Sequence, residues 1–307
     1  MRPPCRVPCR HRRRGRRRRR LSGRNRCRAG PRPHRPGRRL PRGPGGPGLS
    51  TASQPLSLRG AARFWARNAT VGRKTILTTL GPRFVEAIAY LAIMGLGLGA
   101  YLTSVDGISY VAFIAPGIAA SAVMFGAILE TSYNAFVRIH VRRVFEAAVT
   151  TPLSVGDVVV GEYMWGATRG TIYGVVFLIV MAPFGLIDSW WALLCPLVFV
   201  IGALTFGVLG MTYTSFTSNI EHFNIFWTGV MTPMFLFGGI FFPFTALPDW
   251  AQVIGWCLPL SHLVAATREL VMGDVGWVTL GHVVVLSAFA AVLFWVPVRR
   301  LSRTLLA

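Results

Sequence analysis

The chain has 307 residues, of which 52% are hydrophobic and only 14% are charged. This composition is too apolar for an ordinary water-soluble domain and indicates a membrane protein. The formal net charge of +22 does not indicate a nucleic-acid-binding domain, because most of it lies in one tail. Residues 1–50 contain 19 arginines and no acidic residue, whereas the rest of the chain has 14 basic and 11 acidic residues.

Residues 1–50 consist mostly of Arg, Pro and Gly and have too few apolar side chains for a packed core, so we expect this segment to be disordered. No apolar run follows before Phe84, which argues against a cleaved signal peptide. Three interpretations stay open: a start site assigned too far upstream, a tail that contacts anionic lipid, or an RNA-binding arm. The third is the weakest, because no aromatic residues alternate with the arginines.

The segment before the first apolar span has the periodicity of an amphipathic helix. Its cations and its apolar residues fall on opposite arcs, with Arg59, Arg63, Arg67 and Lys74 on one and Ala61, Phe64, Trp65 and Val71 on the other. This pattern predicts a helix that lies on the inner membrane surface. The alternative is a positively charged anchor without a role in transport.

Six runs of the chain are apolar enough to cross a bilayer, whose core of about 30 Å needs about 20 helical residues. They are residues 84–104, 108–128, 170–187, 190–211, 223–244 and 275–298. The third run is long enough only if its helix begins near Glu162 and includes Arg169. Because backbone groups in lipid must be bonded internally, we predict an all-α polytopic membrane protein with six transmembrane helices, formed by residues 51–307.

The distribution of cations predicts that both termini are cytoplasmic, because loops rich in Lys and Arg stay on that side. In this orientation the outer side receives only Arg268. Residues 251–267 are also uncharged, but they contain Pro259 and are only 17 in number. We therefore interpret them as an outer re-entrant or interfacial segment before the last span.

The loop after the second span, residues 138–151, combines charged side chains with apolar ones. The charged residues are Arg138, Arg142, Arg143 and Glu146. A short charged helix held between two membrane helices on the cytoplasmic side would suit docking on a soluble partner; the alternative is a solvated loop that only sets orientation. Ser154 and Asp157 have the spacing of a helix start and predict that the next helix begins there.

Glu130 and Arg169 are the charged residues that the membrane makes costly. At a rise of 1.5 Å per residue, each lies about 9–10 Å from the inner end of its helix. The two side chains are therefore candidates for an ion pair between consecutive antiparallel helices. The alternative is that each extends separately to the inner interface.

Motifs for catalysis and metal binding are missing from the sequence. Lys74, the only lysine, lacks the glycine that precedes it in a nucleotide-binding loop, so we do not expect this chain to hydrolyse ATP. The cysteines form no Cys-x-x-Cys pair, which argues against a structural zinc site. Ser261, His262 and His282 would suit an intramembrane hydrolase, but the sequence has no G-x-S-x-G elbow.

From Ser109 to the C-terminus the sequence resembles the membrane subunit of type-2 ABC exporters, and within them the permeases of the nodulation-factor (lipooligosaccharide) exporter group. The stretches that carry the resemblance are ETSYNAF at 130–136, LSVGD at 153–157 with Gly161-Glu162, TPMFLFGG at 232–239, Phe242-Pro243, Leu247-Pro248 and LPLSH at 258–262. Their order and spacing point strongly to the family and weakly to the cargo.

The resemblance implies an exporter of the bacterial cytoplasmic membrane in which two such permeases pair with two copies of a separate ABC ATPase subunit, which carries the ATP and Mg. It implies that residues 138–151 are the coupling element and that Arg169 shares a role with a basic residue of that group. It also implies that residues 245–270 form an outer re-entrant pair of helices, which includes Pro248, Pro259, Ser261 and His262.

The cargo implied is amphipathic: a lipooligosaccharide, a lipid-linked saccharide or a hydrophobic drug. We expect no cofactor or metal on this chain, membrane lipids around it and no specific nucleic-acid partner. Two other classes of function stay open. A self-powered channel or secondary transporter would have polar residues or broken helices near the midplane, which is nearly uncharged here. An intramembrane enzyme would depend on His262 or His282.

Overall fold

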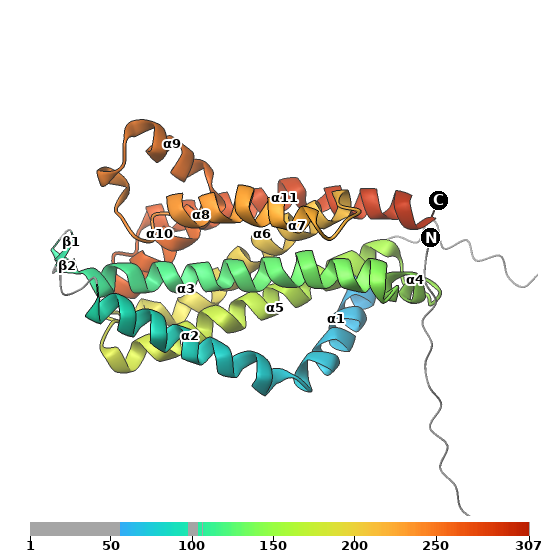
Figure 1. Cartoon of the computed structure of the whole chain (residues 1–307), viewed down its shortest axis with the longest axis horizontal. Helices are drawn as coiled ribbons and strands as arrows, with labels where there is room; N and C mark the ends of the chain where they lie inside the picture. Colours follow the sequence, from blue (N-terminus) through green and yellow to red (C-terminus); the bar gives the residue numbers. More distant parts are fainter. Residues whose placement is uncertain (1–55, 98–103, 106, 307) are drawn as a thin grey trace, which may run out of the picture. The chain divides into compact units, whose positions relative to one another are not determined.

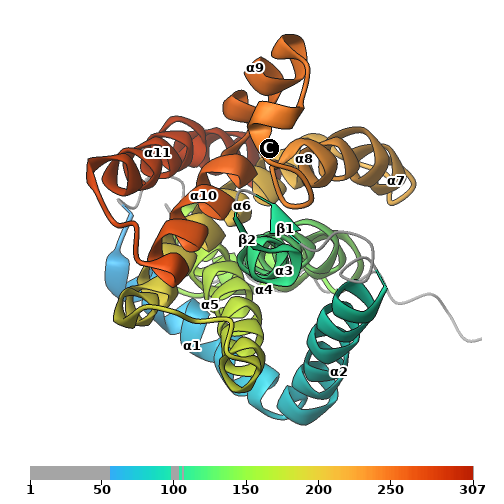
Figure 2. The same ribbon diagram turned by 90° about the vertical axis from the view of Figure 1, so that its left-hand side faces the viewer.

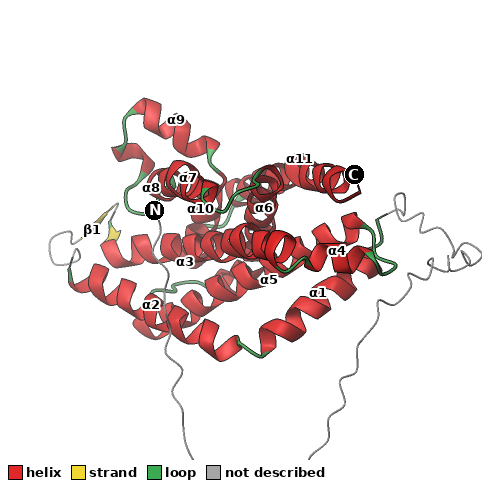
Figure 3. Ribbon diagram, turned by 45° about the vertical axis from the view of Figure 1, so that its right-hand side comes forward, coloured by secondary structure: helices red, strands yellow, loops and turns green. Residues whose placement is uncertain are grey.

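The computed structural model describes residues 56–306 except 98–103 and Asp106. These residues fall in one compact unit, Leu49–Ala307. They form helices, connecting loops and a hairpin of two short antiparallel strands, β1 (Ser104–Val105) and β2 (Ile108–Ser109) (Figure 1, Figure 3). The expected disorder of residues 1–50 lies outside the described residues.

The helical segments follow one another with few long loops. The α-helices are α1 (Leu58–Arg73), α2 (Ile76–Leu96), α3 (Tyr110–Leu129), α4 (Val144–Val149), α5 (Val155–Met181), α6 (Cys195–Phe216), α7 (His222–Phe226), α8 (Thr232–Phe237), α9 (Asp249–Cys257), α10 (Pro259–Met272) and α11 (Trp277–Leu306). Short π-helical segments are η3 (Glu130–Asn134), η4 (Val137–Val141) and η7 (Trp227–Met231), and short 3-10 segments are η5 (Ala182–Phe184), η6 (Trp190–Leu194) and η8 (Phe244–Ala246).

Three long helices form the centre of the unit. α3 packs against α5, α5 against α6, and α6 against α11. Seen end on, α3, α5 and α6 lie centrally, whereas α2 and α11 lie at the periphery (Figure 2). The exposed face of α11 carries Val278, Val284, Val292 and Trp295. An exposed surface this apolar is expected for a helix that contacts lipid or another membrane helix.

Four helices of the described part are long and apolar enough to cross a membrane: Tyr110–Val141, Val155–Phe184, Trp190–Phe216 and Trp277–Thr304. A fifth candidate arises if Leu58–Arg73 and Thr78–Met94, which meet at a 75° bend, count as one span. The chain is thus an all-helical, multi-spanning membrane protein, with four to five candidate spans where the sequence predicted six.

The predicted span 223–244 is wrong beyond Phe237. The chain is helical from α7 through η7 to α8, and this helix ends before Gly238. Gly239 has φ +70, a left-handed conformation that glycine adopts without strain and that commonly terminates helices. The two glycines therefore shorten a run whose apolar composition alone predicts a longer helix.

The start of α5 was predicted correctly from Ser154 and Asp157. Ser154 is the N-cap, and both hydrogen bonds of a capping box are present: the Asp157 backbone N–H donates to Ser154 Oγ (3.1 Å), and the Ser154 N–H donates to Asp157 Oδ2 (3.0 Å). The helix begins at Val155, earlier than the position near Glu162 expected from the apolar run. Glu162 therefore lies two turns inside α5.

Candidate functional site

Helix α1 is attached to α5 at its first turn. The Ser57 N–H, at the N-cap of α1, donates to Asp157 Oδ1 (2.6 Å), so a single carboxylate caps the starts of both helices. Phe64 of α1 is buried against Gly161 of α5 and against Phe145, and the centroids of the two phenylalanine rings lie 6.0 Å apart. The Trp65 indole N–H donates to Thr168 Oγ1 (3.0 Å). Ala61 and Phe64 of the predicted apolar arc are thus buried and Trp65 is bonded to α5, whereas Val71 is 56% exposed. That α1 lies on the inner membrane surface stays a prediction.

The predicted cations of α1 lie on its other side. Arg63 and Arg67 are exposed, and Arg67 Nη1 donates to Asn68 Oδ1 (3.1 Å). Asn68 is buried and donates through Nδ2 to Glu162 Oε1 (3.3 Å). α1 therefore reaches the interior of the unit through a polar side chain as well as through Phe64.

The C-terminal end of the α3 helix leaves regular α geometry at two successive π-helical segments, η3 and η4. Such segments occur frequently at functional sites. Glu130 is the first residue of η3, and Arg138 lies in η4, about 12 Å further along a helix of ordinary rise. Arg138 folds back over this interval, because its Nη1 donates to Glu130 Oε1 (2.8 Å) and its Nη2 to the Glu130 carbonyl (3.0 Å).

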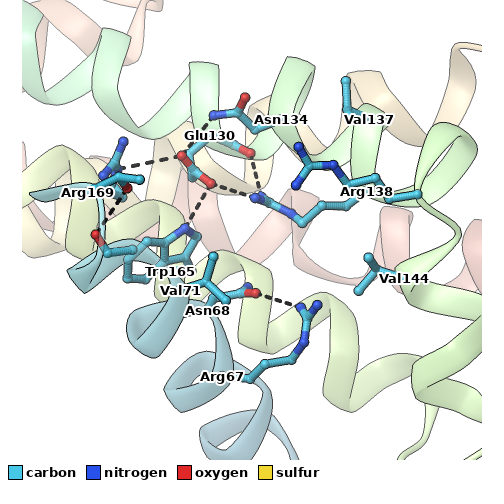
Figure 4. Close-up of a pocket in the computed structure, with 13 residues that line it drawn as sticks. Arg67, Asn68, Val71, Glu130, Asn134, Val137, Arg138, Val144, Trp165 and Arg169 are labelled. Atoms are coloured by element: carbon cyan, nitrogen blue, oxygen red, sulfur yellow. Dashed lines mark hydrogen bonds and ion pairs between the residues drawn. The ribbon is translucent and has the colours of Figure 1, made fainter. Parts of the chain in front are cut away.

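Four charged residues, Glu130, Arg138, Glu162 and Arg169, form what we call the charge cluster. Figure 4 shows Glu130, Arg138 and Arg169. Arg138 bridges two helices, since its Nη2 also lies 2.7 Å from Glu162 Oε2 on α5. Both carboxylates are buried: the Glu162 side chain is 0% exposed and that of Glu130 is 6% exposed. The cluster has two positive and two negative formal charges, as the burial of ions requires.

Neutral side chains complete the bonding of Glu130. The Trp165 indole N–H donates to its Oε1 (2.8 Å), and Asn134 Nδ2 donates to its Oε2 (2.9 Å). With the Arg138 bond, both carboxylate oxygens of Glu130 have hydrogen-bond donors. The Glu130–Arg169 contact considered from the sequence is present, but it is the longest of the cluster, at 3.6 Å between Arg169 Nε and Glu130 Oε2.

The sequence assigned Arg138 to the coupling loop, but the structure places its guanidinium in the charge cluster, with only 16% of the side chain exposed. It did not identify Glu162 as a site residue at all. The capping box at Ser154 could have indicated it, because a helix that starts at Val155 places Glu162 two turns from its end, inside α5.

The loop between the two long helices contains a short helix, α4, as the sequence predicted, but Arg138 belongs to η4 and not to this helix. Arg143 has φ 48 and separates η4 from α4. Arg143 and Glu146 are exposed by 74% and 53% and form an ion pair at 3.6 Å. Phe145 of α4 is fully buried and contacts Phe64 of α1. The loop thus exposes charges outward while one aromatic side chain holds it on α1.

The segment predicted as an outer re-entrant pair consists of α9 and α10. Pro248 precedes α9 and Pro259 is the first residue of α10. Ser261 Oγ donates to the Gly255 carbonyl (2.6 Å), and His262 Nδ1 lies 2.9 Å from Nδ1 of His282 on α11. Burial lowers the pKa of His262, against a smaller opposing effect of its hydrogen bond with the Trp256 carbonyl.

These hydrogen bonds join α9, α10 and α11. Ser261 bonds to a backbone carbonyl rather than to a histidine, so the arrangement expected of a hydrolase is not formed here. Across the described residues, no group of three or more His, Cys, Asp or Glu side chains could hold a metal ion.

Comparison with known proteins assigns the family. The model of the ABC-2 type transporter matches residues 64–272, and the chain therefore belongs to the ABC-2 type transporter family. It is the transmembrane subunit of an ABC exporter of the bacterial inner membrane, and it lacks the ATPase domain, which is a separate subunit. The resemblance noted in the sequence is confirmed, and the self-powered transporter and the intramembrane enzyme are set aside.

Several of the relatives share one name, Nodulation protein J. Nodulation protein J of Rhizobium leguminosarum bv. viciae is 37% identical over 243 residues, which are 79% of this chain and 93% of the relative. Nodulation protein J of Sinorhizobium fredii is 33% identical over 244 residues, with the same shares of the two chains. The inner membrane transport permease YadH of Escherichia coli is 25% identical over 243 residues, 77% of this chain and 93% of the relative.

Proposed function

We propose that two copies of this permease, or one copy and a close relative, pair with two copies of an ABC ATPase subunit, and that the α4 loop is where the ATPase docks. The observation that carries this proposal is that the loop is connected to α1 and α5 by side-chain contacts. Phe145 of α4 contacts Phe64 of α1, and Arg138, the first residue of the loop, bridges η3 to α5 through two buried carboxylates. A displacement of the loop would therefore be transmitted to α1, α3 and α5 together.

The cargo that we propose is amphipathic, with a lipooligosaccharide as the first candidate. This rests on the nodulation-factor exporter group that the sequence resembles and on relatives named Nodulation protein J. A lipid-linked saccharide or a hydrophobic drug belongs to the same chemical class. ATP and Mg would be bound by the ATPase subunit, and this chain would contribute no cofactor site.

We also propose the finer topology of one transmembrane domain, residues 51–307, with six crossings and both termini cytoplasmic. The bent pair α1–α2 would contribute the first crossing, and the helix from α7 to α8 with the segment after it would contribute the fifth. The α9–α10 pair would lie on the outer side. The excess of cations on the opposite side supports this orientation.

Charge reversal in the loop tests the docking proposal. The double variant Arg142→Glu with Arg143→Glu should weaken association with the ATPase subunit by about tenfold or more, because like charges across an interface repel, or should uncouple ATP hydrolysis from transport. The measurement is co-purification and transport per ATP hydrolysed in proteoliposomes. The matched control reverses Arg299 and Arg303, which are exposed at the end of α11. Binding and coupling that equal those of the control would contradict the proposal.

Cysteine labelling tests the orientation. In a parent with its five natural cysteines replaced by serine, Asp249→Cys should react with a membrane-impermeant maleimide added to intact cells, because α9 would face outward. Arg143→Cys should react only after the cells are opened. The opposite labelling pattern would show that the topology is inverted. The α4 loop would then face away from the cytoplasm, where ATP is available, and the docking proposal would be contradicted.

A further inference from the structure

A cavity of about 320 Å³ lies beside the charge cluster, between α1, the C-terminal end of the α3 helix and α5 (Figure 4). Its wall has an excess of positive charge, because four arginines line it: Arg67, Arg138, Arg142 and Arg169. Among the described residues that line the cavity, Glu130 is the one carboxylate. Glu162 does not line it but is bonded to Arg138. Even with both carboxylates counted, the residues that the structure describes leave two positive charges unbalanced at this cavity.

Arg169 is the least satisfied of these cations. Its side chain is only 17% exposed, and within the described part of the chain its guanidinium makes no hydrogen bond, although Nε is buried. The rings of Trp165 and Tyr173 hold it in place, at 5.7 and 5.5 Å from its Cζ. Glu130 contacts it only at 3.6 Å, because Arg138, Trp165 and Asn134 already donate to that carboxylate.

A buried guanidinium without acceptors is costly unless an anion supplies them. The planar donors of arginine match the oxygens of phosphate in pairs. Arg67 and Arg142 are exposed at the same cavity and could contact further oxygens, whereas Asn68, Asn134 and Thr75 add neutral polar groups to the wall.

We propose that this cavity binds a phosphate group, with Arg169 as its inner ligand and Arg67 and Arg142 at its entrance. The phosphate would come either from the headgroup of an anionic lipid, which is abundant in the cytoplasmic leaflet, or from a soluble phosphate. The proposal concerns the permease alone and does not depend on the docking of an ATPase.

The test is thermal unfolding of the purified full-length permease in detergent, titrated with phosphatidylglycerol, with phosphatidylcholine, and with inorganic phosphate against sodium chloride of equal ionic strength. Phosphatidylglycerol should raise Tm in a saturable manner and phosphatidylcholine should not. A rise with inorganic phosphate as well would show that the phosphate group suffices. A rise with phosphatidylglycerol alone would assign the site to a lipid headgroup, and a rise with inorganic phosphate alone would assign it to a soluble ligand.

Variants isolate the cavity from other basic surfaces, including the arginines of residues 1–50. Arg169→Gln should weaken the response about tenfold or more, as expected for lost charge-assisted hydrogen bonds. Arg67→Gln, at the exposed entrance, should weaken it about two- to fivefold and keeps the test valid if Arg169→Gln does not fold. The control is Arg300→Gln, because Arg300 also stacks on an aromatic ring, Phe216, at 4.0 Å, but lies outside the cavity.

Two results would overturn the proposal. One is a wild-type Tm that neither phosphatidylglycerol nor inorganic phosphate raises beyond its control. The other is a response that Arg169→Gln and Arg67→Gln lose no more than Arg300→Gln does. Failure of this test would leave the docking proposal untouched, since no ATPase subunit is present.

Discussion

Replacing Arg138 by methionine is expected to lower the free energy of unfolding by about 3–5 kcal/mol, because it leaves two buried carboxylates without their shared cation. Arg138 contacts Glu130 at 2.8 Å and Glu162 at 2.7 Å, and the Glu162 side chain is fully buried. Methionine keeps most of the volume but cannot compensate either charge. The measurement is chemical or thermal unfolding in detergent or nanodiscs.

The matched control is Arg143→Met, which removes the same charge from a side chain that is 74% exposed and should change stability by no more than about 0.5 kcal/mol. The double variant Arg138→Met with Glu162→Gln should be less damaged than the sum of its two single variants, because a buried charge is removed together with its partner. Arg169→Met should cost less than Arg138→Met, since its contact with Glu130 is 3.6 Å. Additive losses for Arg138 and Glu162 would show that the bridge does not stabilise the fold.

Gly170→Ala is the second substitution with a large expected effect. Helix α5 contacts α3 and α6 so closely at Gly170 that an added Cβ would lie 2.7 Å from the Val123 carbonyl oxygen and 2.9 Å from Ala203 Cβ. Neither atom belongs to a flexible side chain, so whole helices must shift. Small residues allow such close approach of membrane helices, and we expect a loss of about 1–3 kcal/mol from overpacking.

The sign of this effect separates packing from helix propensity, because alanine is the better helix former by about 1 kcal/mol. The control is Gly281→Ala on α11, where nothing lies within 4 Å of the added Cβ. This variant should be neutral or slightly more stable in the same unfolding assay. If Gly170→Ala were as stable as Gly281→Ala, the close contact of α5 with α3 and α6 would not be a feature of the folded protein.

The features that the sequence predicted are those with a local cause. The start of α5 follows from the Ser154–Asp157 capping box, and the break between α9 and α10 falls at Pro259. Apolar runs predict α3, α6 and α11 because a membrane helix is apolar on most of its surface. The end of α8 also has a local cause, the left-handed conformation of Gly239. It was predicted wrongly because the apolar run continues beyond this glycine.

The membership of the charge cluster could not be predicted, because it depends on how η3, η4 and α5 are placed relative to one another. Arg138 reaches Glu130 across two π-helical segments that no pattern in the sequence indicates. An amphipathic helix has the same sequence pattern whether its apolar face packs on lipid or on protein. The burial of Phe64 of α1 against Phe145 therefore follows from tertiary packing and not from the pattern. The cavity at Arg169 arises only once these elements meet.

Photo-crosslinking from α4 tests directly whether the ATPase subunit docks on this helix. The photoreactive residue p-benzoylphenylalanine replaces Glu146, which is exposed on α4, in the full-length permease produced together with its ABC ATPase subunit; Asp249, on α9, is the control position. If the ATPase docks on α4, ultraviolet light should produce an adduct between permease and ATPase from position 146 and none from position 249. An ATPase adduct from position 249, or no adduct from position 146 in a complex that hydrolyses ATP and transports, would contradict it.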